Sequence, residues 1–186
     1  GVDPKLVMAE LTGRSGGISK GKGGSMHMFS KANRFYGGHG IVGAQVPIGC
    51  GLGFAHKYRN EKKISRVYLG DGAMNNGQVF ESFNLASIWD LPVLFIIENN
   101  KYGMGTAADR VAAGGNLVDR AKVFGIEGKK VDGMDFFEVS KAAIEARDFI
   151  NKHKKPYVLE MDTYRFRGHS MSDPALYRSK EEVLEK

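Results

Sequence analysis

A pair of short apolar runs, separated by a helical stretch, constrains the fold of this chain more than any other feature. The runs are Val67–Leu69 and Val93–Ile97, each bounded by turn residues, which is the pattern of buried parallel strands. Between them, Gln78 to Trp89 carries apolar residues at helical spacing, namely Val79, Phe83 and Ala86. Pro92 then separates the helix from the second strand. We therefore predict a strand–helix–strand unit with a right-handed crossover.

Polar residues follow both predicted strands. Gly70-Asp71-Gly72 comes after the first strand and Asn99-Asn100 after the second. Both groups are therefore expected at the carboxyl edge of the sheet, where open α/β sheets bind ligands. A carboxylate facing an amide oxygen suits Mg²⁺, which completes its shell with phosphate oxygens, and the glycines let backbone N–H groups approach a phosphate. Either half alone is explained better as an ordinary turn, but the two halves together favour a metal and phosphate site.

The rest of the chain alternates helices with strands. Helices are predicted at Asp3–Leu11, Ala44–Tyr58 and Phe136–Lys152, with a short helical turn or two at 116–124 and a strand at Tyr157–Met161. Asp135 and Glu138 resemble a capping pair for the helix 136–152, whose expected apolar stripe is Phe136, Val139, Ala143, Ala146 and Ile150. A turn is expected at 131–133 and a mobile segment with a weak helix at 103–115. This alternation predicts an α/β fold, mostly a parallel sheet with helices on both faces, as one domain over residues 1–186.

Glycine marks three further segments. Residues 13–24 are too rich in glycine for a helix or strand and predict a hinge or a surface of close approach, while the Walker pattern is absent. Residues 38–43 match GxGxxG, but no apolar strand precedes them, which argues against a dinucleotide site. In the helix 44–58, the small residues Ala44, Gly49, Gly51, Gly53 and Ala55 suggest that another backbone comes close. Either a neighbouring subunit or an internal helix–sheet contact would explain them.

Composition and single residues exclude several classes of protein. The net charge of +6 comes from basic residues spread along the chain without a nucleic-acid motif, so we expect no nucleic-acid partner. No apolar run approaches the ~20 residues of a membrane span, and no secretory leader is recognisable. The start at Gly1 and the stop inside a helix at Lys186 suggest a piece of a longer polypeptide. Cys50 is expected to be a small core residue, and His27 a structural one.

The segment after the last predicted strand is basic. Arg165, Arg167, Gly168 and His169 follow that strand and should also lie at the carboxyl edge of the sheet. His169 has the chemistry to donate a hydrogen bond to a developing negative charge, and the arginines attract anions. A basic surface loop is an equally good interpretation of these residues alone.

Three longer stretches carry a resemblance. Gly-Asp-Gly, about 26 residues and Asn-Asn resemble the thiamine diphosphate signature, as in GDGAMNNGQVFESFNLASIWDLPVLFIIENNKYGMGT. The same resemblance is carried by two further stretches, FYGGHGIVGAQVPIG and YRFRGHSMSDP. Over nearly the whole chain, the sequence resembles the thiamine diphosphate-dependent 2-oxo acid dehydrogenase family, in particular the alpha subunits of the decarboxylating component of pyruvate dehydrogenase.

The resemblance implies a thiamine diphosphate-binding fold and a set of site residues. It implies Mg²⁺ bound by Asp71, Asn100 and the backbone carbonyl of Tyr102, phosphate contacts from Gly72 and Ala73, and cofactor contacts from Gly40 and Val42. It also implies a catalytic, cofactor-contacting His169. The activity implied is oxidative decarboxylation of pyruvate with acetyl transfer to a lipoyl-bearing acyltransferase component. A beta subunit would complete an alpha2beta2 heterotetramer and supply the activating glutamate, which leaves Glu81 as an interface or relay residue.

The same resemblance bears on regulation and location. Ser170 matches a position that a kinase phosphorylates in mitochondrial members, whereas the second such position lacks a serine and the third falls on Ala107. This pattern favours the bacterial cytoplasm, with the mitochondrial matrix as the alternative. Other hypotheses are an alpha subunit acting on branched-chain 2-oxo acids or acetoin, and a non-catalytic assembly module.

Overall fold

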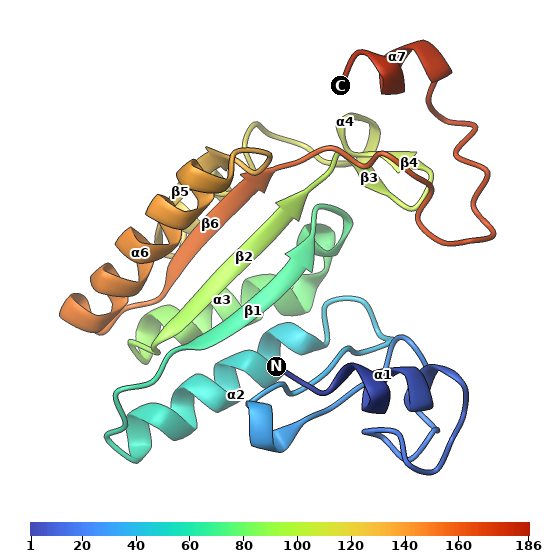
Figure 1. Cartoon of the computed structure of the whole chain (residues 1–186). Coiled ribbons are helices and arrows are strands. Elements are labelled where there is room, and N and C mark those ends of the chain that lie inside the picture. Colours follow the sequence, from blue (N-terminus) through green and yellow to red (C-terminus); the bar gives the residue numbers. More distant parts are fainter. The chain divides into compact units, whose positions relative to one another are not determined.

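Four parallel strands form one sheet in the computed structural model, which describes all residues 1–186. The strands are β1 (Ser65–Gly70), β2 (Val93–Asn99), β5 (Glu127–Asp132) and β6 (Tyr157–Asp162). Their order across the sheet is β1-β2-β6-β5, and every neighbouring pair is parallel. In Figure 1 the visible arrowheads of β1, β2 and β6 all point toward the same edge. The predicted α/β fold with a mostly parallel sheet is confirmed.

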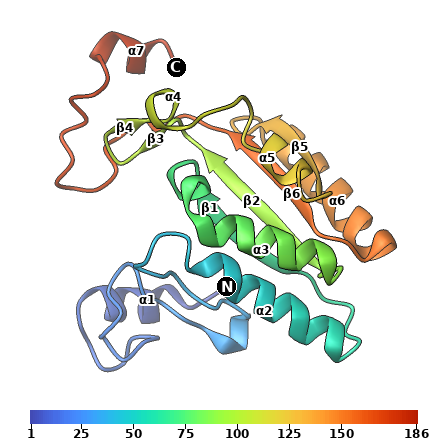
Figure 2. The same cartoon turned by 180° about the vertical axis from the view of Figure 1, so that it is seen from behind.

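Helices cover both faces of this sheet. On one face α2 (Gln45–Tyr58), α3 (Gly77–Ile88) and α5 (Asp119–Lys122) enclose the larger core, and on the other α6 (Phe136–His153) encloses the smaller one. Figure 1 shows α6 against one face, and Figure 2 shows α3 and α5 in front of the opposite face. The centre of the larger core is Phe83 of α3 packed edge-on against Phe95 of β2, with ring centroids 4.8 Å apart. The predicted strand–helix–strand unit is therefore β1-α3-β2.

Side-chain caps define where two of these helices begin. Asn76 accepts a hydrogen bond from the N–H of Gln78 at the start of α3, and Asp135 accepts from Phe137 and Glu138 at the start of α6. The predicted apolar stripe of α6 is confirmed at Val139, Ala146 and Ile150, which pack in or against the smaller core, and is wrong at Phe136. Its buried positions are Ala142, Ala146 and Ile150, whereas Phe136, the first residue of the helix, is 74% exposed.

The strand β5 corrects the turn expected at 131–133. Val131 and Asp132 belong to this strand, and the turn consists of Gly133 and Met134. β5 and β1 are the two edge strands of the sheet, but β1 buries three of its residues, whereas only Val131 of β5 is buried, so the sequence EGKKVD has no apolar run. An edge strand needs fewer apolar residues than a central one, and charged residues protect it from pairing with other chains. The 103–115 segment contains the predicted weak helix, at Ala108–Val111, and is preceded and entered by two short strands, Tyr102–Gly103 and Thr106–Ala107, that were not expected.

The glycines of α2 serve two different surfaces. A Cβ at Gly49 would overlap Val67 of β1, and one at Gly53 would lie 2.6 Å from Val93 Cγ2. These two glycines therefore allow α2 to pack directly on the sheet, which confirms the internal alternative for them. Gly51 has open space around it and is exposed.

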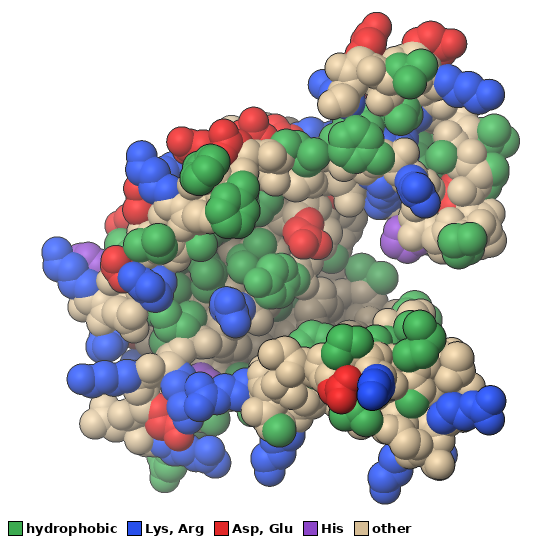
Figure 3. Space-filling view, viewed as in Figure 1, with side chains coloured by type: hydrophobic (Ala, Val, Ile, Leu, Met, Phe, Trp, Pro, Cys, Tyr) green, Lys and Arg blue, Asp and Glu red, His purple; other side chains and the backbone are tan.

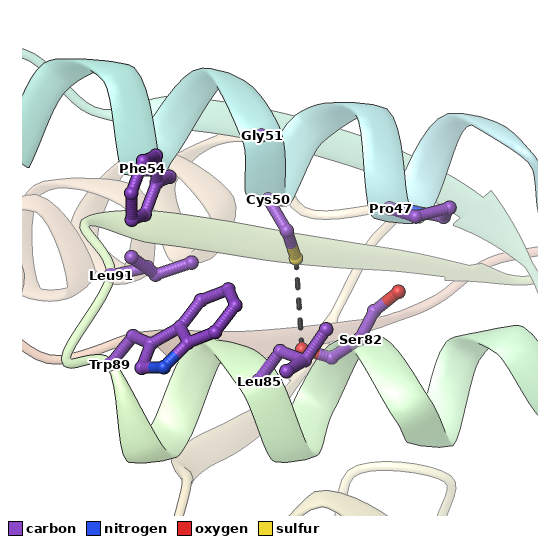
Figure 4. Close-up of a pocket in the computed structure, with 8 residues that line it drawn as sticks. All are labelled: Pro47, Cys50, Gly51, Phe54, Ser82, Leu85, Trp89 and Leu91. Atoms are coloured by element: carbon purple, nitrogen blue, oxygen red, sulfur yellow. Dashed lines mark hydrogen bonds between the residues drawn. The ribbon is translucent and has the colours of Figure 1, made fainter.

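An apolar groove of about 300 Å³ lies between α2 and α3. Figure 4 shows the residues that line it, which are Pro47, Cys50, Gly51, Phe54, Ser82, Leu85, Trp89 and Leu91. Cys50 donates to the carbonyl of Ser82 at 3.7 Å, and burial raises the pKa of its thiol to about 12. Cys50 is thus an unreactive core residue, as expected. The groove lacks charged side chains, so it does not suit an anionic ligand.

Residues 1–45 form a separate compact unit from residues 46–186. The smaller unit contains α1 (Pro4–Leu11), capped by Asp3, and a single 3-10 turn, η1 (Lys31–Asn33). Residues 13–24 wrap around Glu10, which accepts hydrogen bonds from the N–H groups of Ser19, Gly21 and Gly23. The glycine-rich segment is therefore a surface of close approach. No strand precedes residues 38–43, in agreement with the argument against a dinucleotide site.

Charged side chains are distributed over many elements. In the view of Figure 3, lysine and arginine side chains, in blue, occupy several separate areas. None of the helices combines the length and the apolar character needed to cross a membrane.

Candidate functional site

The polar turns after β1 and β2 lie side by side at the carboxyl edge of the sheet. The two strands are adjacent and in register, with Gly70 opposite Glu98. After β1 the chain forms the 3-10 turn η2 (Gly72–Asn75), and after β2 it forms a hairpin of β3 (Tyr102–Gly103) and β4 (Thr106–Ala107), followed by α4 (Ala108–Val111). A Cβ at Gly72 would lie 3.3 Å from Gly103 Cα, so the turn and the hairpin are in contact.

Asp71 supplies a buried carboxylate to this edge. Only 3% of the residue is exposed, and its Oδ2 atom has no hydrogen-bond partner. Burial raises the pKa of Asp71, although the N–H groups of Asp71 and Asn100 and the charges of Arg165 and Lys101 act in the opposite direction. A buried carboxylate oxygen without a partner is unfavourable until a cation or a donor reaches it. Asp71 therefore fits the role of a metal ligand.

Asn100 and Tyr102, the other two predicted metal ligands, lie in the turn that leaves β2. The side-chain oxygen of Asn100 accepts a hydrogen bond from the N–H of Tyr102 at 3.3 Å. The carbonyl oxygen of Tyr102 accepts one from Arg165 Nη2 at 2.6 Å. Each of these oxygens keeps a second lone pair, so both can still coordinate a cation. The structure thus brings Asp71, Asn100 and Tyr102 to one edge, while their role as ligands stays a prediction.

Arg165 connects the end of β6 with the hairpin. Besides Tyr102, its guanidinium donates to the carbonyl of Met104 at 2.7 Å. It also contributes positive charge near Asp71. The prediction that this arginine lies at the carboxyl edge of the sheet is confirmed, and its contacts show that it fixes the hairpin. Its two bonds to main-chain carbonyls hold the backbone around Tyr102 in place.

Glu160 is a second buried carboxylate near this edge, and the sequence pattern alone does not connect it with the site. It is 0% exposed, lies inside β6 and accepts a hydrogen bond from Asn99 Nδ2 at 2.8 Å. Its two partners, Asn99 and the N–H of Val118, are distant in the sequence, so local spacing cannot identify them. The available signal is a carboxylate within the otherwise apolar run Tyr157–Met161.

His169 and Ser170 lie on the irregular segment after β6, and both are exposed. The backbone N–H of His169 donates to Asp173 Oδ2 at 2.7 Å. Asp173 also accepts from the N–H of Ala175 and the hydroxyl of Tyr177, both at 2.9 Å. Asp173 therefore organises this segment, which leads to α7 (Lys180–Leu184), and leaves the His169 side chain free to meet a ligand.

The remaining predicted contacts fall in different surroundings. Ala73 is buried within η2, and Gly72 is exposed beside it. Gly40 and Val42 lie in the unit of residues 1–45, and both are exposed. No group of three or more His, Cys, Asp or Glu side chains is arranged to hold a metal. The predicted magnesium site is of another kind, with one carboxylate, one amide and one main-chain carbonyl.

Comparison with known proteins shows which family the chain belongs to. The model of the family described as "Dehydrogenase E1 component" matches residues 1–186, the whole chain. The chain belongs to the dehydrogenase E1 component family. The fold and the sequence resemblance agree with this membership.

Several curated proteins are very similar to this chain in sequence. The pyruvate dehydrogenase E1 component subunit alpha of Zymomonas mobilis is 61% identical over 98% of this chain and 52% of its own length. The protein of the same name from Rhizobium meliloti is 60% identical, over 98% of this chain and 53% of its own length. The mitochondrial subunit alpha of Saccharomyces cerevisiae is 55% identical, over 98% of this chain and 43% of its own length. The chain thus spans about half the length of the curated relatives it matches.

Proposed function

We propose that this chain carries the Mg²⁺ and diphosphate site of a thiamine diphosphate-dependent pyruvate dehydrogenase and is part of its alpha subunit. The observation that carries the proposal is the buried Oδ2 atom of Asp71, which has no partner at the carboxyl edge of the sheet. A divalent cation would satisfy this atom and offset the cost of burying the charge. The names of the relatives support pyruvate as the substrate.

The residues at the edge match what such a group requires. Mg²⁺ is typically held by one or two carboxylates together with phosphate oxygens, and Asp71 supplies one carboxylate. Asn100 and the carbonyl of Tyr102 would add two neutral oxygens. Gly72 and Ala73, which directly follow Asp71, would present main-chain groups to the diphosphate. By the family resemblance alone, Gly40 and Val42 are proposed as further cofactor contacts.

The chain's own residues would bind and orient the reactants. Arg165 fixes the hairpin that carries Tyr102 and adds positive charge near the diphosphate. The exposed His169 would donate a hydrogen bond to an anionic group of the substrate. When bound, thiamine diphosphate supplies the electron sink that decarboxylation of a 2-oxo acid needs.

A beta subunit is part of the proposal. It would complete an alpha2beta2 heterotetramer and provide the carboxylate that activates the cofactor, with Glu81, which is exposed on α3, at or near the interface. The acetyl group would pass to a lipoyl-bearing acyltransferase component. We expect no turnover from the chain alone, and a bacterial cytoplasmic location, with the mitochondrial matrix as the alternative that the yeast relative represents.

Ser170 is proposed as a modification site. Its side chain is exposed, and its hydroxyl lies 3.0 Å from that of Ser172. A phosphate there would add a charge of about −1.5 to −2. This charge would repel the cofactor diphosphate and displace the segment around His169.

Titration calorimetry on the full-length chain assembled with its beta partner tests the proposal. We expect saturable binding of thiamine diphosphate that requires Mg²⁺, weakened by more than about 100-fold in Asp71→Ala, because loss of a direct ligand should exceed the 10–100-fold effect of an outer partner. Absence of heat in the unaltered protein would favour a non-catalytic assembly module. Comparing turnover of pyruvate, branched-chain 2-oxo acids and acetoin then identifies the substrate.

A further inference from the structure

We propose that Glu160 is a positioning residue for the metal site. It holds Asn99 in one orientation, and through Asn99 it fixes the turn that carries Asn100. The inference rests on the proposed function, since it concerns how the Mg²⁺ site is shaped. It adds a residue that does not touch the metal or the cofactor.

Both oxygens of the Glu160 carboxylate are used. Oε1 accepts from Asn99 Nδ2 at 2.8 Å, and Oε2 accepts from the N–H of Val118 at 2.8 Å. Glu160 is 0% exposed, and Asn99 is 7% exposed. Glu160 therefore joins the end of β2 to the segment before α5, inside the larger core. Because water does not reach these groups, each lost bond leaves a buried polar atom without a partner.

The bond to Glu160 determines which way the Asn99 amide points. With Nδ2 directed at the carboxylate, the Oδ1 atom of Asn99 accepts from the N–H of Lys101 at 3.3 Å. Lys101 has a φ of +71°, in the left-handed region, and its ammonium group pairs with Asp162 of β6. Asn100 lies between Asn99 and Lys101 and is held from both sides. The direction of its side chain therefore depends on this arrangement.

A carboxylate is the group that this arrangement requires. A glutamine side chain in place of Glu160 could accept from Val118 but would then direct its own amide N–H₂ toward Asn99 Nδ2. Asn99 would have to turn over, and its Nδ2 would then face the N–H of Lys101, which is also a donor. Either arrangement breaks one of three hydrogen bonds: Asn99 to Glu160, Val118 to Glu160, or Lys101 to Asn99. Replacing buried polar partners with well-packed apolar side chains often costs no stability, so the retention of this hydrogen-bonded pair favours a role in positioning.

The variant Glu160→Gln, in the full-length chain assembled with its beta partner, tests this inference. We expect the affinity for thiamine diphosphate in the presence of Mg²⁺ to fall by about 10–100-fold, the typical effect of losing a residue that orients a metal ligand. The measurement is calorimetric binding, together with the melting temperature of the cofactor-free protein. Val158→Ala is the matched control, because Val158 lies two residues earlier on the same strand and faces the same core. It should lower the melting temperature without changing the affinity.

The double variant Asn99→Asp with Glu160→Gln provides a rescue. The two substitutions exchange the carboxylate and the amide between the two positions. The new carboxylate on β2 would accept hydrogen bonds from the N–H₂ group of the new amide on β6 and from the N–H of Lys101. The oxygen of the new amide would accept from the N–H of Val118. All three hydrogen bonds are therefore restored. The number of carboxylates is also unchanged. We expect the affinity of the double variant to recover to within a few-fold of the unaltered protein, whereas Asn99→Asp alone places two carboxylates in contact and should bind poorly.

The outcomes separate this inference from the proposed function. If the unaltered protein does not bind thiamine diphosphate with Mg²⁺, the proposed function fails and the positioning role fails with it. If the unaltered protein binds but Glu160→Gln retains its affinity, only the positioning role fails. The positioning role also fails if Val158→Ala loses as much affinity for the cofactor as Glu160→Gln does at an equal drop in melting temperature. It fails as well if the double variant folds but does not regain the affinity of the unaltered protein. Should Glu160→Gln not fold, the double variant decides the question in the same way.

Discussion

Asp71 and Glu10 are both buried carboxylates next to glycine-rich backbone, and their surroundings are opposite. Glu10, in the unit of residues 1–45, is 0% exposed and accepts three backbone N–H groups at 2.6–2.8 Å. Asp71, in the unit of residues 46–186, is 3% exposed and has an oxygen with no partner. Burial alone therefore does not distinguish a ligand site from a structural one. The unsatisfied oxygen does.

The pKa directions follow from these bonds. Burial raises the pKa of Glu10, but the N–H groups of Gly21, Gly23, Ser19 and Gly24 outweigh it, so the pKa is lowered overall. For Asp71, burial is the dominant cause, and the pKa is raised. Backbone N–H donors favour the ionised form, and loss of hydration favours the neutral form. Glu10 is thus part of the fold as an anion, whereas Asp71 is an anion that the cofactor-free fold leaves unsatisfied.

The largest expected difference between the two residues is in stability. Glu10→Ala leaves the partly buried N–H groups of Ser19, Gly21 and Gly23 without an acceptor, and we expect the melting temperature to drop by several degrees. Asp71→Asn removes an unsatisfied buried charge and should leave the melting temperature of the cofactor-free protein unchanged or raise it. Differential scanning calorimetry in a metal chelator compares the two. If Asp71→Asn lowered the melting temperature more than Glu10→Ala did, Asp71 rather than Glu10 would be the carboxylate that stabilises the fold.

A smaller effect is expected from two neighbouring glycines. A Cβ at Gly17 would lie 2.6 Å from Glu10 Cα, whereas one at Gly16 would have no neighbour within 4 Å. Gly17→Ala should lower the free energy of unfolding by about 1–3 kcal/mol through overpacking, and Gly16→Ala should change it by less than about 0.5 kcal/mol. Urea unfolding measures both. Equal effects would mean that the loop does not pack closely on Glu10.

The smallest and most specific effect is on pH dependence. Because the folded pKa of Glu10 lies below 4.5, its ordinary value, its stabilising effect is complete above pH 4.5 and is lost as pH falls through the folded value. The folded pKa of Asp71 lies above its ordinary value of 3.8, so its ionisation reduces stability as pH rises above 3.8 through the folded value. In urea unfolding without Mg²⁺, the free energy of unfolding of Asp71→Asn should therefore rise relative to that of the unaltered protein as pH increases above 3.8. The free energy of unfolding of Glu10→Gln should fall relative to that of the unaltered protein as pH increases from the folded pKa of Glu10 to 4.5.

Much of the architecture follows from local sequence. The apolar runs around Val67 and Val93 predict β1 and β2, and the helices of β1-α3-β2 and α6 begin within a residue of their predicted positions. The edge strand β5 was not predicted, because a strand that is only partly covered needs no apolar run. The glycines of α2 predict close packing, but only the three-dimensional structure shows that Gly49 and Gly53 lie against the sheet, whereas Gly51 lies at the open groove between α2 and α3.

The sequence by itself determined the parallel α/β class and the placement of Asp71 and Asn100 after two strands, because apolar period and turn chemistry are local properties. The family was indicated by the resemblance of the sequence over nearly the whole chain and is shown by the match of the family model. Only the tertiary structure decided the strand order, the hold of Arg165 on Tyr102 and the bond between Glu160 and Asn99. The last of these joins residues 61 positions apart. Such contacts depend on which strands become neighbours, and that is set by how the helices pack on the sheet rather than by the residues that make the contact.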